Sequence, residues 1–158
     1  MPYRVYDINK SLIDECFKST DLGKIEYCQY DEFCLHGEMK IEEDLVKRIY
    51  HTTGLKQNID VASTKVNHTQ YNIEKLYELD PHLDYCPITL IVYLKKDPSV
   101  VDEFWVDKKQ VTEERWNPQP NHYTALVMWS VEKDGHGAEH EGYFKGEGYR
   151  EVMCFFLG

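Results

Sequence analysis

The sequence lacks any apolar run approaching the 18 or so residues that a transmembrane helix needs, and no apolar leader-like segment follows the first Met. Internal repeats and low-complexity tracts are also missing. The five cysteines are odd in number and form no Cys-x-x-Cys pair, which indicates free or buried thiols in a reducing compartment. We therefore expect a cytoplasmic protein without a membrane anchor.

Basic residues are few beside acidic ones: 18 Lys and Arg against 28 Asp and Glu, a net charge of −10. Such a field repels nucleic acid and anionic membranes, so a nucleic-acid partner is not expected and a basic or neutral partner is easier to accommodate. A chain of 158 residues is long enough for one domain with a substantial core and too short for two. Residues 1–158 are therefore predicted to form a single domain.

Helical and strand patterns divide the chain near residue 60. Apolar residues recur at helical spacing over 8–19 and 40–51, and the second stretch has acids early and bases late, as the helix dipole favours. Residues 88–94 (ITLIVYL) are apolar on both faces and predict a buried central strand. Further strands are expected over the following ranges: 102–107, 121–129 and 150–157. The sequence therefore predicts an α+β protein, with a helical flank over 1–60 and a strand-built core over 61–158.

The segment DPHLDY (80–85) places His82 and Asp84 two residues apart, directly before the most apolar strand. Residues i and i+2 of a strand share a face, so the two side chains would point the same way, as in a metal site or a solvated turn. With seven histidines and 28 acids, about one His-x-Asp/Glu match arises by chance, and a second is present at His36-Gly37-Glu38, in a stretch read as helical. A 2-His-1-carboxylate iron site would need a further histidine from a distant strand.

The C-terminal stretch supplies that histidine. Residues 140–157 (HEGYFKGEGYREVMCFFL) are predicted to form a hairpin around a loop at 146–148, with Phe144 opposite Arg150. His140 and Arg150 would then share a face roughly 13–14 Å apart. That gap fits a small dicarboxylate with one end on a metal and the other on the guanidinium. His136 is an alternative distal histidine that fits the spacing to Arg150 less well.

The combined pattern QYN, DPHLDY, ITLIVYL and HEGYFKGEGYREVMCFFL, across residues 66–157, resembles the Fe(II)/2-oxoglutarate-dependent oxygenases, most closely their prolyl-hydroxylase-like branch. The resemblance implies a double-stranded β-helix (jelly roll) with iron held by His82, Asp84 and His140. It also implies 2-oxoglutarate and O₂ as cosubstrates, and Arg150 as the partner of the C5 carboxylate. The usual Gly-Gly-Glu-Leu segment is replaced here by SVVDEFWVD (99–107).

The resemblance assigns pocket roles to aromatic residues as well. Tyr71 and Tyr93 match family tyrosines that contact 2-oxoglutarate or line its pocket, and core packing is an equally good reading of both. Four more aromatics could line an apolar substrate pocket, although a core role is the commoner one: Trp105, Trp116, Tyr123 and Trp129. The activity implied is hydroxylation of a C–H bond, with a prolyl or other side chain of a protein or peptide as the expected substrate.

Two other classes of function remain open from sequence. His51-Thr52-Thr53 and His122-Tyr123-Thr124 are both His-x-Thr, a pair that resembles the two-histidine phosphoesterases acting on small cyclic phosphates. The net negative charge disfavours a phosphate ligand. The third class is a catalytically inactive jelly roll that serves as a binding module.

Overall fold

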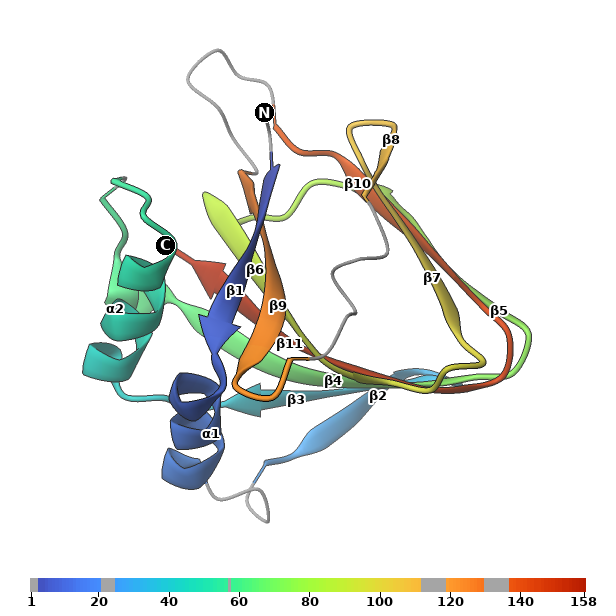
Figure 1. Cartoon of the computed structure of the whole chain (residues 1–158), viewed down its shortest axis with the longest axis horizontal. Helices are drawn as coiled ribbons and strands as arrows, with labels where there is room; N and C mark the ends of the chain where they lie inside the picture. The colour runs from blue at the N-terminus through green and yellow to red at the C-terminus, as the bar shows by residue number, and fades with distance from the viewer. Residues whose placement is uncertain (1–2, 21–24, 57, 112–118, 130–136) are drawn as a thin grey trace.

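A computed structural model describes residues 3–20, 25–56, 58–111, 119–129 and 137–158, and within them two antiparallel β-sheets lie face to face (Figure 1). The major sheet has seven strands in the order β1-β9-β6-β11-β4-β3-β2. Their bounds are β1 Tyr3–Asn9, β2 Tyr27–Asp31, β3 Cys34–Met39, β4 Lys65–Ile73, β6 Ile88–Lys96, β9 His122–Trp129 and β11 Gly148–Leu157. The minor sheet, in the order β5-β10-β7-β8, comprises β5 Leu76–His82, β10 His140–Lys145, β7 Val101–Val106 and β8 Lys109–Val111.

Strand β6 explains why the described residues form two apolar cores. It lies in the middle of the major sheet between β9 and β11, and Ile88 to Tyr93 are all buried. Leu90 and Val92 join the cluster on the helix side, whereas Ile91 and Tyr93 join the cluster between the sheets. A strand covered on both faces reads as a continuous apolar run, as the sequence predicted.

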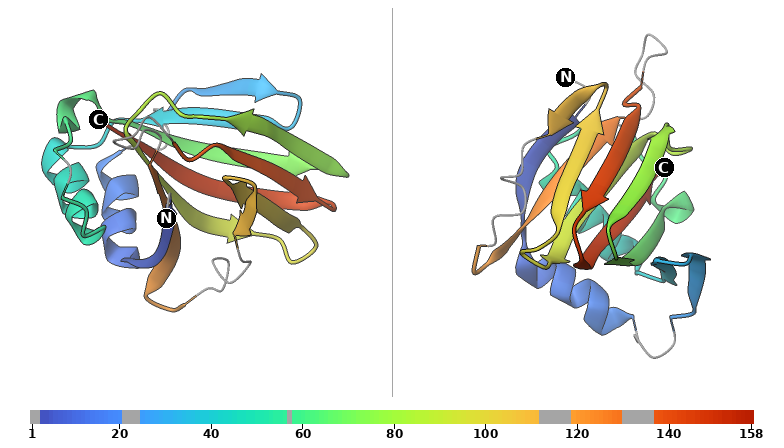
Figure 2. Two further views of the ribbon diagram at one scale, coloured as in Figure 1. Left: turned by 90° about the horizontal axis from the view of Figure 1, so that it is seen from above. Right: turned by 90° about the vertical axis from the view of Figure 1, so that its right-hand side faces the viewer.

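Two helices cover the outer face of the major sheet (Figure 2, left). Helix α1 (Lys10–Ser19) is capped by the Asn9 side chain and buries Ile13 and Cys16. Helix α2 (Glu43–Thr52) carries acids in its first turn and buries Leu45, Val46 and Ile49. A 3₁₀ turn, Val61–Ser63, follows. The predicted α+β class and jelly-roll core with helices on one side are confirmed. In the described part of the chain, no helix has the length and apolar character to cross a bilayer.

The N-terminal part contains strands that the sequence did not reveal. β1 pairs along its whole length with β9, and β2 and β3 extend the major sheet beyond β4. His36, Gly37 and Glu38 lie on β3, so the helical reading of this stretch was wrong. Sheet pairing with β4 overrides the local polar pattern. Gly37 is the local signal, because a Cβ there would collide with the Ile25 side chain.

The predicted C-terminal hairpin was also wrong. β10 pairs with β5 and β7, whereas β11 pairs with β4 and β6, so the chain crosses from one sheet to the other between them. Gly146 turns the chain with φ +101°. Phe144 and Arg150 do meet, but across the sandwich, with the guanidinium carbon 3.8 Å from the Phe144 ring.

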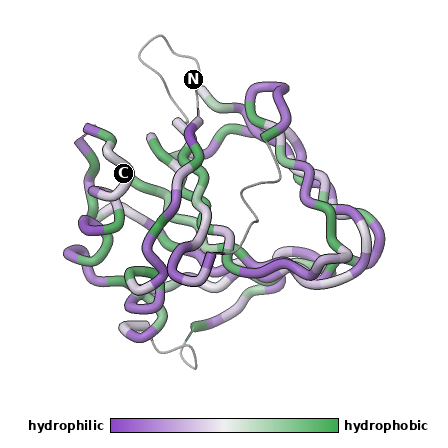
Figure 3. The backbone as a smooth tube through the Cα atoms, viewed as in Figure 1, coloured by the Kyte–Doolittle hydropathy of each residue, from purple (hydrophilic) through white to green (hydrophobic). Residues whose placement is uncertain are grey.

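A two-residue hairpin in the minor sheet instead joins β7 to β8. Asp107 and Lys108 have φ of +51° and +62°, as two-residue hairpin loops require. This turn is hydrophilic, as Figure 3 shows. The minor sheet is therefore a β7–β8 hairpin extended by β10 and closed at its other edge by β5. That edge strand carries the first residue of the site described below.

Candidate metal and anion site

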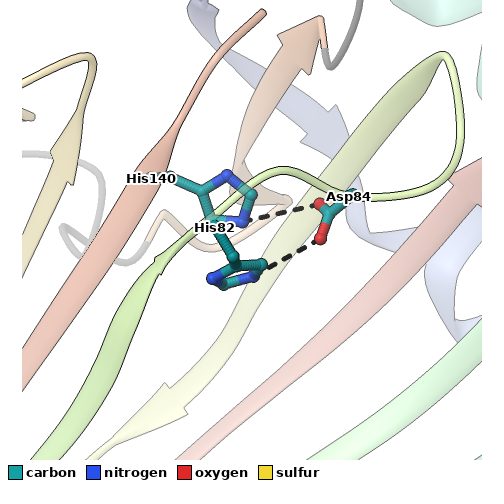
Figure 4. Close-up of side chains that lie close together, drawn as sticks. All are labelled: His82, Asp84 and His140. Atoms are coloured by element: carbon teal, nitrogen blue, oxygen red, sulfur yellow. Dashed lines mark ion pairs between the residues drawn. The ribbon is translucent and has the colours of Figure 1, made fainter.

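Three predicted ligands come together at one end of the minor sheet (Figure 4). His82 is the last residue of β5, Asp84 lies in the loop after it, and His140 opens β10 directly opposite His82. One ligand atom from each residue lies within 4.8 Å of the other two. His82 and Asp84 were predicted at the start of one strand. In the structure β5 ends between them, so the loop, and not the alternation of a strand, turns Asp84 toward the histidines.

Both imidazoles present the same nitrogen to Asp84. His82 Nε2 lies 3.5 Å from Asp84 Oδ1, and His140 Nε2 lies 3.5 Å from Asp84 Oδ2. On the far side of each ring, Nδ1 contacts a carbonyl oxygen: Asp80 O at 2.7 Å for His82, and Ala138 O at 3.0 Å for His140. A carbonyl only accepts, so Nδ1 carries the proton and, in the neutral ring, Nε2 keeps its lone pair. This is how metal-binding histidines are oriented in proteins.

Asp84 and His140 have the charge states that a metal requires. Burial alone would raise the pKa of Asp84, but His82, His140 and the Thr89 hydroxyl, which donates to Oδ2 at 2.6 Å, together lower it. Burial lowers the pKa of His140 and favours the neutral ring. The neighbouring Asp84 carboxylate raises the pKa of His82, the most exposed of the three. Protons therefore compete with a metal most strongly at His82.

A cavity of about 210 Å³ leads from these ligands into the space between the sheets. Its wall at the far end includes Arg150 and Phe144, and its apolar sides include Ile91, Phe104 and Val152. On the side of β3 and β4 the wall is polar, with His36 and Thr69 hydrogen-bonded at 3.0 Å. The candidate ligands and the arginine thus line one cavity, although the hairpin predicted to bring them together does not form.

Arg150 is buried in the core at the far end of the cavity, which we call the closed end. Its side chain is 2% exposed, and Nε donates to Asp102 Oδ2 at 2.8 Å. The Tyr71 ring lies 4.9 Å from the guanidinium carbon, and Phe144 stacks closer still. Burial opposes the charge, yet the Asp102 carboxylate keeps the pKa of Arg150 above its ordinary value. The closed end therefore holds a permanent cation between aromatic faces.

The two tyrosines differ in their access to the cavity. Tyr71 lines it, and burial raises its pKa, so the phenol stays protonated. Tyr93 is buried 6.0 Å from the guanidinium carbon and is not among the residues that line the cavity. Of the two tyrosines, Tyr71 therefore borders the cavity and Tyr93 does not.

Several sequence candidates lie elsewhere. Trp105, Tyr123 and Trp129 do not line this cavity, while Trp116 and His136 fall outside the described residues. Thr89 and Asp102 were missed. The signal for Asp102, which is completely buried, was its position between the apolar residues Val100 and Phe104, two positions away on either side.

The two His-x-Thr motifs do not build a phosphate site around this cavity. His51 lies near the end of helix α2, where the phosphoesterase reading needs a strand. His122 opens β9 and pairs with Asn9 of β1. Both histidines are exposed, and neither lines the cavity. No observation in the described residues favours the phosphoesterase.

Comparison with known proteins bears on the fold. No family model and no curated protein matches the sequence. Among solved structures, a prolyl-4-hydroxylase from Pseudomonas putida aligns with a TM-score of 0.57 at 12% identity, covering 99% of this chain and 92% of that one. The structure of IDO from Bacillus thuringiensis aligns with a TM-score of 0.55 at 11% identity, covering 98% and 92%. The chain therefore has the oxygenase-like jelly-roll fold that the sequence motifs suggested.

Proposed function

We propose that the protein is an Fe(II)/2-oxoglutarate-dependent dioxygenase that hydroxylates a C–H bond. The observation that carries the proposal is the pair of imidazoles with Nδ1 anchored on carbonyls and Nε2 facing Asp84, at one end of a cavity that has a buried arginine at the other. A fold shared with a prolyl-4-hydroxylase supports it.

The donor set fits ferrous iron. Two imidazole nitrogens and one carboxylate form the facial triad used by non-haem iron oxygenases, which leaves coordination positions open. Ligand atoms that share a transition metal lie roughly 3 Å apart, because each bond is about 2.0–2.2 Å long. The 3.5 Å separations between His82 or His140 Nε2 and the Asp84 oxygens are close to that spacing. His82, Asp84 and His140 would hold the iron.

The chain's own residues orient the reactants and exclude water. When bound, iron with 2-oxoglutarate supplies the oxidation, in which O₂ is consumed and succinate and CO₂ are released. Arg150 would pair with the C5 carboxylate, and Tyr71 would lie beside it. The apolar walls at Ile91, Phe104 and Val152 keep the interior dry, which strengthens that ion pair. Thr89 holds Asp84 in the ligating orientation.

For the substrate we propose a prolyl or other side chain of a protein or peptide. The name of the Pseudomonas putida neighbour supports a prolyl group, and the net charge of −10 supports a basic or neutral sequence around it. All five cysteines are free thiols, which fits the proposed cytoplasmic location. Incubation with proline-containing peptides, read as a mass gain of one oxygen with matching succinate, tests the substrate.

The iron site is tested by anaerobic titration of the metal-free protein with Fe(II) and 2-oxoglutarate. The visible charge-transfer band of the chelate is expected only when both are present, and it should be lost in His82→Ala. His51→Ala, an exposed histidine on α2, is the matched control and should keep the band. A wild-type protein without band or bound iron would refute the oxygenase and leave the inactive binding module and the two-histidine phosphoesterase.

A further inference from the structure

The residue that raises a new question is Asp102, an acid that is completely buried between the sheets. It lies on β7, two positions before Phe104 of the same strand and two positions after Val100, which precedes the strand; both neighbours are 1% exposed. An ionised carboxylate at such a position is costly unless a partner compensates it. Its ion pair with Arg150 provides that partner, at 2.8 Å from Nε to Oδ2.

The ion pair joins the two sheets. Asp102 comes from the minor sheet, where its register partner is Phe144 of β10, and Arg150 comes from the major sheet, where its register partner is Tyr71 of β4. The same two partners are the rings that lie 3.8 and 4.9 Å from the guanidinium carbon. Aromatic faces and one carboxylate together restrict the rotation and tilt of the guanidinium.

The cavity meets only one member of the pair. Arg150 lines it, whereas Asp102, which accepts from Nε of the guanidinium, does not. Nε is one of five N–H donors on a planar fork, and fixing it sets the plane and direction of the others. A carboxylate that binds an arginine as a fork needs that direction to be right.

We propose that Asp102 is a positioning residue that aims Arg150 at the distal carboxylate of a dicarboxylate cosubstrate. The inference rests on the proposed function. It assigns the role to a residue of SVVDEFWVD, the segment that replaces Gly-Gly-Glu-Leu. Asp102 acts through Arg150 and does not touch the ligand.

The test compares two 2-oxo acids on protein loaded with Mn(II) under anaerobic conditions. 2-Oxoglutarate has the distal carboxylate and pyruvate lacks it, so the ratio of their affinities, measured by calorimetry, reports the contribution of Arg150. Asp102→Ala should lower the affinity for 2-oxoglutarate roughly tenfold or more, because the guanidinium loses its anchor. The affinities for Mn(II) and for pyruvate should not change.

Two further variants and a control complete the design. Asp102→Asn keeps an oxygen acceptor for Nε and should stay closer to the wild-type ratio than Asp102→Ala does. If Asp102→Ala does not fold, Asp102→Ser, too short to reach Nε, replaces it. Glu151→Gln is the matched control. Glu151 is the next residue after Arg150 and contacts His68 and Tyr149 instead of the guanidinium. The ratio of the affinities for 2-oxoglutarate and pyruvate should therefore not change in this variant.

The possible failures are distinguishable. A folded Asp102→Ala or Asp102→Ser protein with an unchanged or larger ratio would overturn the positioning role while leaving the oxygenase proposal intact. A wild-type protein that binds Mn(II) but shows no preference for 2-oxoglutarate over pyruvate would overturn both, because Arg150 itself would then have no carboxylate to hold.

Discussion

The two ends of the cavity are built in different ways. At the metal end, the side chains of His82, Asp84 and His140 are 39%, 12% and 5% exposed, and they come from the end of one strand, a loop and the start of another. At the closed end, Arg150 and Asp102 are 2% and 0% exposed and lie within strands of opposite sheets. Side chains that would bind and release a metal can lie at strand ends. A side chain that only has to keep a fixed charge, such as Arg150, can lie within the core.

This difference implies that the two ends contribute unequally to stability. Removing one member of a buried ion pair leaves an uncompensated charge in the core, which costs more than the pair contributes while intact. Removing His82, whose side chain is 39% exposed, leaves a partly solvated position that water can fill. Substitutions at the closed end should therefore change both folding and cosubstrate binding, and substitutions at the metal end should change metal binding alone.

The largest effect on stability is expected for Arg150→Ala. The change leaves the Asp102 carboxyl buried without its guanidinium, and it should lower the free energy of unfolding by about 3–5 kcal/mol. Urea unfolding followed by circular dichroism measures it. The double change Arg150→Met with Asp102→Leu should recover most of the loss without restoring 2-oxoglutarate binding. A single Arg150→Ala protein as stable as the wild type would contradict the unequal contribution of the two cavity ends to stability.

The largest effect on metal binding is expected for His140→Ala. Loss of one of three ligands should reduce Fe(II) affinity at least about 100-fold, with thermal stability of the metal-free protein changed little by comparison with Arg150→Ala. Anaerobic metal titration and thermal unfolding give the two values. Metal affinity within a few-fold of wild type would place the ion elsewhere.

A smaller effect on the same end is expected for Thr89→Val. The change removes the hydroxyl that donates to Asp84 Oδ2 at 2.6 Å and keeps the shape of the side chain. Metal affinity should fall about tenfold, as for other residues that orient a ligand. The same titration tests it, and an unchanged affinity would show that the Asp84 orientation is set by the backbone.

The smallest effect concerns the helix-facing side of the major sheet, away from the cavity. Burial raises the pKa of Glu151, but hydrogen bonds from His68 and Tyr149 outweigh it and hold the pKa below the ordinary value. A carboxyl with a depressed pKa in the folded state stabilises the protein above its unfolded pKa of about 4.5, and the contribution disappears as the pH falls through the folded pKa.

Glu151→Gln should therefore lose about 1 kcal/mol of stability near neutral pH and approach the wild type below pH of about 4. Urea unfolding over that pH range compares the two proteins. A constant difference at all pH values would mean that packing, and not ionisation, accounts for the effect of Glu151.

The sequence could predict which side chains meet at the cavity because candidate metal and anion ligands have characteristic residue types at characteristic spacings. His82, Asp84, His140 and Arg150 line one cavity, as expected. The reason given for their proximity was partly wrong. β10 and β11 face each other across the sandwich and do not pair, so Phe144 reaches Arg150 from the opposite sheet.

What sequence patterns could not give were contacts made only by packing one sheet on the other. The Asp102–Arg150 pair joins residues 48 positions apart, and no local signal connects them. Likewise, the sequence of β3 looks polar because the face that carries His36 lines the cavity. Its partner strand β4 lies some thirty residues away, so no local pattern predicts the pairing. Local patterns define elements, whereas sheet order decides which side chains meet.

In the proposed function, one ligand spans the cavity from the three metal ligands to Arg150. A crystal structure of the protein grown without oxygen with Mn(II) and 2-oxoglutarate tests it most directly. We expect the metal on His82 Nε2, Asp84 and His140 Nε2, the 2-oxo acid end of the ligand on that metal and its distal carboxylate on the Arg150 guanidinium. A metal bound elsewhere, or a ligand whose distal carboxylate lies away from Arg150, would contradict it.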